Sequence, residues 1–335
     1  MATKVGVIGA GSWGTALAAL LAGKGYETTI WSRGSEVADS INKRHTNQVY
    51  LPDLKLPETL KATTDLATAL QGAELIVCVV PSGAMRETMR SAAAFISDEA
   101  IVVSASKGIE DDSLKTMHEV IGEEIGHPNR VGAVSGPSFA AEVVRDDMPT
   151  VVVAAASTDE VAARIQEYFN VEHRMRAYRS TDLIGVELGG VVKNVMAIAT
   201  GVSDGLGYGL NARAATITRG LAEIMRLAVA MGAKPETMAG LAGVGDLVLT
   251  CTGDLSRNRR VGLRLGAGET LEEVQDGMRM VAEGVRNTKA VKALAAREGV
   301  DMPIVDCVYQ VLYEGMKPQQ ALVELFGREP KPEFR

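Results

Sequence analysis

The sequence predicts an α/β domain with a doubly wound parallel sheet, followed by an all-α domain. As far as residue 180, short apolar runs typical of buried parallel strands alternate with helical patterns. From residue 181 onward the strand patterns end, and helical patterns continue with Gly and Pro between them. We therefore expect a nucleotide-binding domain over residues 1–180 and a helical substrate domain over residues 181–335.

The first strand-to-helix turn carries a dinucleotide-binding motif. Residues 5–8 have a strand pattern, and Gly9, Gly11 and Gly14 then form G-x-G-x-x-G ahead of an alanine- and leucine-rich helical run. Gly9 allows a tight turn, Gly11 lets the backbone approach a pyrophosphate, and Gly14 lets the helix pack close to the strand. Free N–H groups and the dipole at the helix start favour the phosphate charge. The motif predicts a Rossmann domain; a glycine-rich turn that binds nothing is the alternative.

Arg33 follows the second expected strand, residues 27–32, at the place where the cofactor's adenosine ribose is read. A carboxylate there favours NAD, whereas a planar guanidinium can pair with the 2′-phosphate of NADP(H) or stack on adenine. Arg33 therefore favours NADP(H). An exposed arginine without a role is the alternative, and the neighbouring Glu36 leaves use of NAD(H) open.

Later strands are expected over residues 74–80, 100–106, 131–135 and 150–155. Ligands of such sheets bind beyond the carboxyl ends of the strands. Pro81, Lys107 and the segment 136–140 follow those ends, as the glycine motif and Arg33 follow theirs. This convergence predicts the ligand-binding edge of the sheet.

Lys193 is the candidate general acid/base of the helical domain. It lies three and four residues after the adjacent Gly190 and Gly189, on the same face of an apolar helix. Each glycine costs roughly 1 kcal/mol against alanine, which indicates close approach of another group. Burial can lower a lysine pKa toward about 7–8, which suits proton transfer. The alternative is a lysine whose ammonium reaches water. Asp246, in a glycine turn, either caps a helix or orients this lysine.

Ser256, Arg257 and Asn258 open a later helix and predict an anion site. Arginine binds phosphate bidentately, and the helix start adds free N–H groups. Arg259 and Arg260, taken singly, fit a solvated basic face equally well.

Composition excludes several function classes. The 335 residues are 46% hydrophobic with a net charge of −7, which argues against a general nucleic-acid binder. Three distant cysteines predict no disulfide framework and indicate a reducing compartment. The four histidines lack metal-ligand spacing, so we expect no metal. We also expect no signal peptide and no membrane-spanning segment.

The chain resembles the bacterial-type NAD(P)-dependent glycerol-3-phosphate dehydrogenases over nearly its whole length. The resemblance rests on seven motifs in order, and no key position is substituted. These motifs are VIGAGSWGTALA, INKRHTNQVYLP, SASKGIE, SGPSFAAEV, VVKNVMAIATG, GLAGVGDLVLTCTGDLSRNRRVG and VAEGVRNTKAV. The resemblance implies a Rossmann domain and a helical domain of the 6-phosphogluconate-dehydrogenase-like kind, in a homodimer.

The resemblance also implies residue roles. Lys193 is the implied proton acceptor, and Lys107 and Asp246 complete the catalytic set. The implied cofactor contacts, besides Gly9, Gly11 and Gly14, are Ser12, Trp13, Arg33, Tyr50, Lys107, Ala140, Arg257, Val281 and Glu283. The implied substrate contacts are Lys107, Gly136, Ser138, Lys193, Asp246, Ser256, Arg257 and Asn258.

The implied reaction is the reversible reduction of dihydroxyacetone phosphate to sn-glycerol 3-phosphate with NADP(H), or alternatively NAD(H). Its product points to phospholipid synthesis in the cytoplasm. A 3-hydroxyacid or 6-phosphogluconate dehydrogenase with the same plan is one alternative, and it would act on a carboxylate substrate. A non-catalytic NADPH sensor is another, and it would bind the cofactor without turnover.

Overall fold

The computed structural model describes residues 2–276, 282–330 and 332–333. The described chain packs as two units. The first runs as far as Gly190 and regains a later segment, Ala233–Asp246; the second contains Val191–Gly232 and the chain from Leu247 onward. The division falls inside two helices, α8 (Leu183–Gly205) and α11 (Asp246–Thr252). The predicted fold class, an α/β domain with a helical domain, is confirmed.

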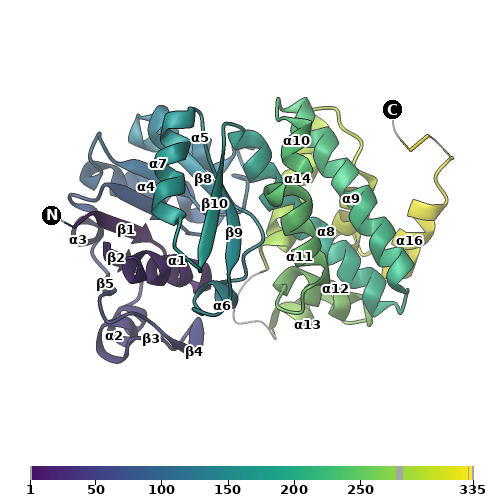
Figure 1. The fold of residues 1–335 in the computed structure, drawn as a ribbon. Coiled ribbons are helices and arrows are strands. Elements are labelled where there is room, and N and C mark those ends of the chain that lie inside the picture. The colour runs from purple at the N-terminus through teal and green to yellow at the C-terminus, as the bar shows by residue number, and fades with distance from the viewer. Residues whose placement is uncertain (1, 277–281, 331, 334–335) are drawn as a thin grey trace. The chain divides into compact units, whose positions relative to one another are not determined.

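An eight-stranded sheet forms the centre of the first unit, within the described residues (Figure 1). Strand β1 lies inside the sheet with β6 on one side and β2 on the other. The order is β10 (Met175–Ser180), β9 (Thr150–Ala156), β8 (Val131–Ser135), β7 (Ile101–Ser104), β6 (Leu75–Cys78), β1 (Lys4–Ile8), β2 (Glu27–Trp31) and β5 (Lys61–Thr63).

One strand pair departs from the expected all-parallel sheet. Strand β9 runs antiparallel to β8, whereas β10 is parallel to β9. The connection from β8 to β9 contains only the short helix α6 (Ala140–Val143), whereas a parallel crossover usually needs a full covering helix. Helix α7 (Asp159–Phe169) provides that crossover between β9 and β10.

Helices cover both faces of the sheet, because side chains of each strand point alternately to its two faces. Leu75 and Val77 join a core cluster with α1 (Ser12–Gly23), α2 (Ser35–Arg44), α6 and α7. Ile76 and Cys78, the residues between and after them, join a cluster with α3 (Leu66–Leu70), α4 (Met85–Ala92) and α5 (Met117–Ile125). The near-continuous apolar run of β6 is therefore buried on both faces, as its composition predicts.

The start of α8 packs on the sheet in a third cluster. Leu183 and Val186 contact side chains of β8 and β9, and Ala242 of the returning segment joins them. Because of this packing, the first turns of α8 belong to the first unit although the sequence there is helical.

Two short elements differ from the sequence interpretation. Residues 45–57, for which the sequence analysis gives no strand, contain the antiparallel pair β3 (Thr46–Asn47) and β4 (Leu51–Lys55). The basic stretch around Arg176 and Arg179 lies in the edge strand β10, where alternate residues are exposed. A strand with one solvated face carries too few apolar residues to be recognised by composition.

The second unit is helical throughout its described residues (Figure 1). Besides the later turns of α8 and α11, its helices are α9 (Leu210–Ala230), α12 (Arg257–Gly266), α13 (Leu271–Asp276), α14 (Glu283–Arg297), α15 (Pro303–Tyr313) and α16 (Pro318–Phe326).

Helices α8 and α12 approach each other through glycines. A Cβ on Gly201 would lie 2.2 Å from Arg259 O, and one on Gly262 would lie 2.1 Å from Ile198 O. A second glycine lies four residues after each of them: Gly205 after Gly201, and Gly266 after Gly262. The spacing puts each pair on one helix face, so the two backbones pack directly. This packing fixes the start of α12 relative to the part of α8 that carries Lys193.

By length and composition, α8 is apolar enough to cross a membrane. The helix is, however, 89% buried over its most apolar window. Core helices of globular proteins pass the same test, so the finding is weak evidence for a membrane span.

Candidate functional site

The glycine turn has the backbone geometry that its sequence predicts. Gly9 has φ +113°, a conformation that other residues rarely adopt. A Cβ on Gly14 would lie 1.9 Å from Gly9 O, so α1 packs directly on the turn. A Cβ on Gly11, the N-cap of α1, would meet no protein atom within 4 Å. The turn is thus closed where it packs on protein and open where a pyrophosphate would approach.

Two predicted cofactor residues lie beside this turn. The hydroxyl of Ser12 donates to Tyr50 O at 3.2 Å, and Trp13 packs against the core cluster. Asn47, which the sequence interpretation missed, connects the two segments. Its Nδ2 donates to Ala10 O at 3.0 Å, and its Oδ1 accepts from Tyr50 N at 3.2 Å. An asparagine outside every predicted helix and strand provides no periodic signal, so only the tertiary structure reveals this contact.

Arg33 is exposed between the end of β2 and the start of α2. Glu36 lies in the first turn of α2. The guanidinium is therefore accessible to a ligand at the carboxyl edge of the sheet.

Lys107 follows strand β7 and forms an ion pair with Asp246 of the returning segment. Lys107 Nζ lies 2.7 Å from Asp246 Oδ2, and the Asp246 side chain is only 1% exposed. Asp246 is the first residue of α11. The sequence interpretation considered a helix cap or an orienting role toward Lys193; the structure pairs the carboxylate with Lys107.

The other predicted residues of the first unit follow β8. Gly136 has φ +131°, and Ser138 donates its hydroxyl hydrogen to Gly136 O at 2.9 Å. Ala140 begins helix α6. These residues form the turn at the carboxyl end of β8.

The adjacent glycines of α8 have two different neighbours. A Cβ on Gly189 would lie 2.2 Å from Ala242 O, which is backbone of the returning segment. A Cβ on Gly190 would lie 2.6 Å from Ser135 Oγ and 3.7 Å from side-chain carbons of Lys107. The close approach that the sequence indicated is therefore an approach of this protein's own groups.

Lys193 is buried in the second unit, with 5% of its surface exposed. Its Nζ donates to Thr250 Oγ1 at 2.8 Å. The alternative of a lysine that reaches water is therefore wrong. Thr250 was missed, although it lies four residues after Asp246 in α11 and so shares a helix face with it.

The start of α12 has the predicted polar groups. Ser256 is the N-cap, and its hydroxyl accepts from Arg259 N at 3.2 Å. Asn258 Nδ2 donates to Asn194 Oδ1, and Asn258 Oδ1 accepts from Gly284 N, both at 2.9 Å. Asn258 therefore connects α12 to α8, next to Lys193, and to the start of α14.

Arg257 and Glu283 interact electrostatically. Burial lowers the pKa of the Arg257 guanidinium, and the Glu283 carboxylate opposes this effect. Burial raises the pKa of the Glu283 carboxyl, against the influence of Arg257 and Arg286. A partly desolvated guanidinium at the start of α12 suits the recognition of an anion, whereas the Glu283 carboxylate at the start of α14 does not. Val281, the remaining predicted cofactor residue, lies outside the described residues.

Arg259 differs from the solvated basic face considered for it. It is only 7% exposed and forms ion pairs with Asp204 at 2.8 Å and Asp254 at 2.9 Å. Arg259 therefore stabilises the second unit, whereas Arg260 is exposed as expected.

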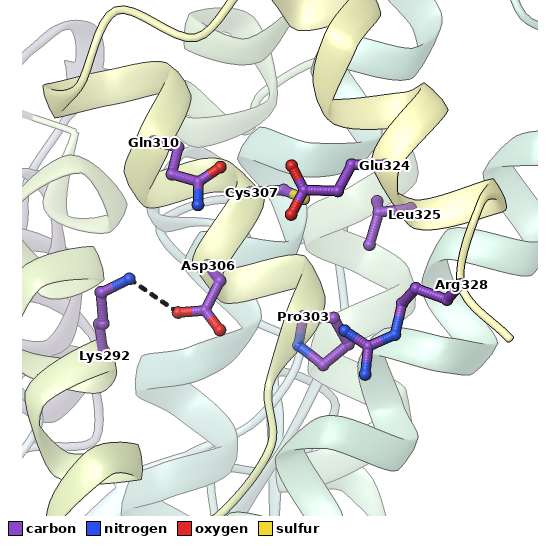
Figure 2. Close-up of a pocket in the computed structure, with 8 residues that line it drawn as sticks. All are labelled: Lys292, Pro303, Asp306, Cys307, Gln310, Glu324, Leu325 and Arg328. Atoms are coloured by element: carbon purple, nitrogen blue, oxygen red, sulfur yellow. Dashed lines mark hydrogen bonds and ion pairs between the residues drawn. The ribbon is translucent and has the colours of Figure 1, made fainter.

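A cavity of about 180 Å³ lies elsewhere in the second unit (Figure 2). Lys292, Asp306, Cys307 and Arg328 are among its lining residues, and Lys292 is paired with Asp306 at 2.9 Å. None of the predicted site residues is among the described residues that line it. Within the described chain, no group of three or more His, Cys, Asp or Glu is placed to hold a metal ion.

Two family models match the chain. The model described as NAD-dependent glycerol-3-phosphate dehydrogenase N-terminus matches residues 4–162, and the corresponding C-terminus model matches residues 182–323. A glycerol-3-phosphate dehydrogenase (NAD(P)+) of Citrifermentans bemidjiense is 54% identical, and the alignment covers 99% of both chains.

Solved structures agree with these matches. The crystal structure of glycerol-3-phosphate dehydrogenase from Coxiella burnetii is 44% identical, covers 98% of this chain and 99% of its own, and has a TM-score of 0.92. The glycerol-3-phosphate dehydrogenase from Saccharomyces cerevisiae is 28% identical, covers 96% and 98%, and has a TM-score of 0.81.

Proposed function

The chain belongs to the NAD-dependent glycerol-3-phosphate dehydrogenase family, and from that premise we propose that it reversibly reduces dihydroxyacetone phosphate to sn-glycerol 3-phosphate. The observation that carries the proposal is the burial of Lys193 in the largely apolar helix α8. The Lys193 ammonium donates a hydrogen bond to Thr250 of α11. A proton donor of this kind suits the reduction of a carbonyl group. The alternative functions, a 3-hydroxyacid or 6-phosphogluconate dehydrogenase and an NADPH sensor, are not favoured, because the relative matched over 99% of both chains is a glycerol-3-phosphate dehydrogenase.

The glycine turn suits a dinucleotide cofactor. It has a positive-φ glycine, a helix start without a side-chain cap, and open space beside Gly11. Gly9, Gly11, Ser12, Trp13 and Gly14 would hold the pyrophosphate side. The exposed Arg33 would pair with the 2′-phosphate of NADP(H), and the neighbouring Glu36 leaves NAD(H) as a second cofactor. Tyr50, Lys107, Ala140, Arg257, Val281 and Glu283 are the further proposed cofactor contacts.

Lys193 moves the proton in the proposed mechanism. When bound, the reduced nicotinamide supplies a hydride to the C2 carbonyl carbon of the ketone. Lys193, as the ammonium, donates a hydrogen bond and then its proton to the C2 oxygen, which becomes the product hydroxyl. In the reverse direction, neutral Lys193 removes that proton.

The phosphate of the substrate is assigned to the start of α12. Arg257 supplies a charge-assisted pair, and Ser256 and Asn258 supply polar side chains at the helix start. The phosphate charge would also oppose the desolvation that lowers the pKa of Arg257.

Lys107 and Asp246 complete the catalytic set that we propose. Lys107 adds positive charge that stabilises the developing alkoxide at C2. Asp246 orients that lysine through their ion pair. Gly136 and Ser138 are the remaining proposed substrate contacts.

We also propose a cytoplasmic homodimer whose product enters phospholipid synthesis. The proposed halves of the sequence are residues 1–180 for the cofactor and residues 181–335 for the substrate. Size-exclusion chromatography with light scattering would test the dimer directly.

The loss of reduced-nicotinamide absorbance with dihydroxyacetone phosphate tests the reaction. NADPH and NADH are assayed side by side, with unphosphorylated dihydroxyacetone as the control ketone. We expect rapid oxidation only with the phosphorylated ketone, and faster oxidation of NADPH. Cofactor binding without oxidation of either cofactor would contradict the proposal and favour the carboxylate dehydrogenase or the sensor.

A further inference from the structure

The returning segment, Ala233–Asp246, packs with the first unit although a long excursion of the chain precedes it. It contains the short helix α10 (Pro235–Met238) and the π-helical turn η4 (Leu241–Gly245), and it ends at Asp246. Neither element is long enough to be stable alone. Contacts with the rest of the first unit therefore position this segment, which ends at Asp246, the first residue of α11.

Asp182 makes the polar contacts that hold the beginning of this segment. Its Oδ2 accepts from Lys234 N at 2.9 Å and from Thr237 Oγ1 at 2.5 Å. Its Oδ1 accepts from Gly185 N at 2.9 Å, in the first turn of α8. Asp182 is 6% exposed, and a carboxylate is buried to that extent only when donors satisfy it. One carboxylate thus connects the start of α8 to the start of the returning segment.

Close backbone packing holds the middle of the segment. The absent Cβ of Gly189 would lie 2.2 Å from Ala242 O, so η4 lies directly on α8. A Cβ on Gly243 would lie 2.1 Å from Met238 O, so η4 is also folded tightly onto α10. We therefore expect a displacement at Thr237 to reach η4 through this packing.

The end of the segment meets the proposed catalytic machinery. Asp246 follows η4 directly and pairs with Lys107 at 2.7 Å. The side chain of Lys107 passes beside Gly190, one residue after the glycine that contacts η4. The same stretch of α8 therefore contacts both the segment that carries Asp246 and the lysine that pairs with it.

We propose that Asp182 is a positioning residue for Asp246. By anchoring α10 and η4 on the first turns of α8, it sets the distance between the Asp246 carboxylate and Lys107. The inference rests on the proposed function, since the consequence is for the rate of carbonyl reduction. It assigns to Asp182 no contact with substrate or cofactor.

The test compares Asp182→Asn with Asp65→Asn. Asp65 is the control at an exposed position: its Oδ2 also accepts from a backbone N–H and a threonine hydroxyl, those of Thr68, at the start of α3. Asp182→Asn should lower kcat about tenfold or more while the Kd for NADPH changes less than about twofold. Asp65→Asn should leave kcat unchanged. Thr237→Val is the second variant, for use if Asp182→Asn fails to fold. It removes one contact and keeps the carboxylate, so its loss of kcat should be smaller than that expected of Asp182→Asn.

A double-mutant cycle separates positioning from general destabilisation. In an Asp246→Asn background, Asp182→Asn should lower kcat by less than about threefold, because the two residues act through one contact. Full additivity of the two losses would overturn the proposal, as would an unchanged kcat in Asp182→Asn.

Hydrogen exchange provides a readout that does not depend on turnover. Amide exchange over residues 234–245 should accelerate in Asp182→Asn and in Thr237→Val, but not in Asp65→Asn. This result is measurable even if dihydroxyacetone phosphate is not the substrate, so it distinguishes failure of this inference from failure of the proposed function. Unchanged exchange over the segment would overturn the inference.

Discussion

Lys193 and Thr250 form a hydrogen bond of 2.8 Å between two side chains that are 5% and 4% exposed. A buried ammonium is costly unless hydrogen-bond acceptors satisfy it. Thr250 meets part of that requirement and also holds the ammonium in one direction. The pair therefore holds the Lys193 ammonium in place, as the proton donor that we propose requires.

Lys193→Ala should reduce kcat about 10²- to 10⁴-fold, because the variant loses the proton donor to the C2 oxygen. The Kd for NADPH, measured by fluorescence titration, should change less than about twofold. Turnover like that of the wild type in Lys193→Ala would contradict the assigned role.

Two further variants accompany this experiment, and the second of them is the control. Thr250→Val keeps the side-chain shape and removes the acceptor, so kcat should fall about tenfold. Lys289→Ala removes an exposed lysine of the same unit, which lies over the Tyr313 ring, and should leave kcat unchanged.

Arg33→Asp should shift cofactor preference from NADPH toward NADH. The variant lacks the guanidinium that would pair with the 2′-phosphate of NADPH. Its carboxylate would repel that phosphate and would accept hydrogen bonds from the ribose hydroxyls of NADH. The ratio of kcat/KM for NADPH over NADH should fall about tenfold or more. Arg44→Asp, at an exposed position late in α2, is the control. An unaltered ratio in Arg33→Asp would show that Arg33 does not contact the 2′-phosphate.

Asn258→Ala should lower both substrate affinity and stability. The change leaves Gly284 N without its acceptor and removes the donor to Asn194 Oδ1, at a cost of about 1–3 kcal/mol. The KM for dihydroxyacetone phosphate should rise about tenfold, because the helix start to which we assign the phosphate loses a polar side chain. Chemical denaturation and initial rates measure the two effects.

Asn42→Ala is the control for Asn258→Ala. Asn42 likewise donates to and accepts from backbone, both at Ala62, but in the first unit. It should change stability without changing the KM for dihydroxyacetone phosphate. An equal rise in KM in both variants would count against the phosphate site at α12.

Glu223 should make the stability of the protein depend on pH. Burial raises the pKa of its carboxyl from an ordinary 4.5 to about 7, while hydrogen bonds from Ile304 N and Val305 N and the charge of Arg226 oppose that rise. Because the folded-state pKa is the higher one, the stabilisation is complete below pH 4.5 and is lost as the pH rises through 7. The pKa difference corresponds to about 3 kcal/mol.

Thermal unfolding between pH 4.5 and 8 measures this effect. Glu223→Gln cannot titrate, so its Tm should fall less with rising pH than the Tm of the wild type. Glu272→Gln, at an exposed position in α13, should follow the wild type. Parallel curves for the wild type and Glu223→Gln would contradict the prediction.

Much of the fold was predictable because local patterns specify it. Buried strands such as β6 and β7 have continuous apolar runs. In helices such as α9, apolar residues recur about every three or four positions. The antiparallel direction of β9 was missed, since a strand's composition does not record its direction. The partly exposed β10 was missed because alternate solvated residues dilute the apolar signal.

The candidate site residues could be recognised in the sequence: the glycine turn, Arg33, Lys107, Lys193, and the polar start of α12. Their residue types, their spacing along the chain and their positions in helices carry that information. Their partners became visible in the folded structure alone. Lys107 pairs with Asp246, Lys193 with Thr250, and Asn258 with Asn194, each across a long separation in sequence. Such pairs form because the packing of helices and strands brings distant segments of the backbone together. The order of residues along the chain does not show which distant segments will meet.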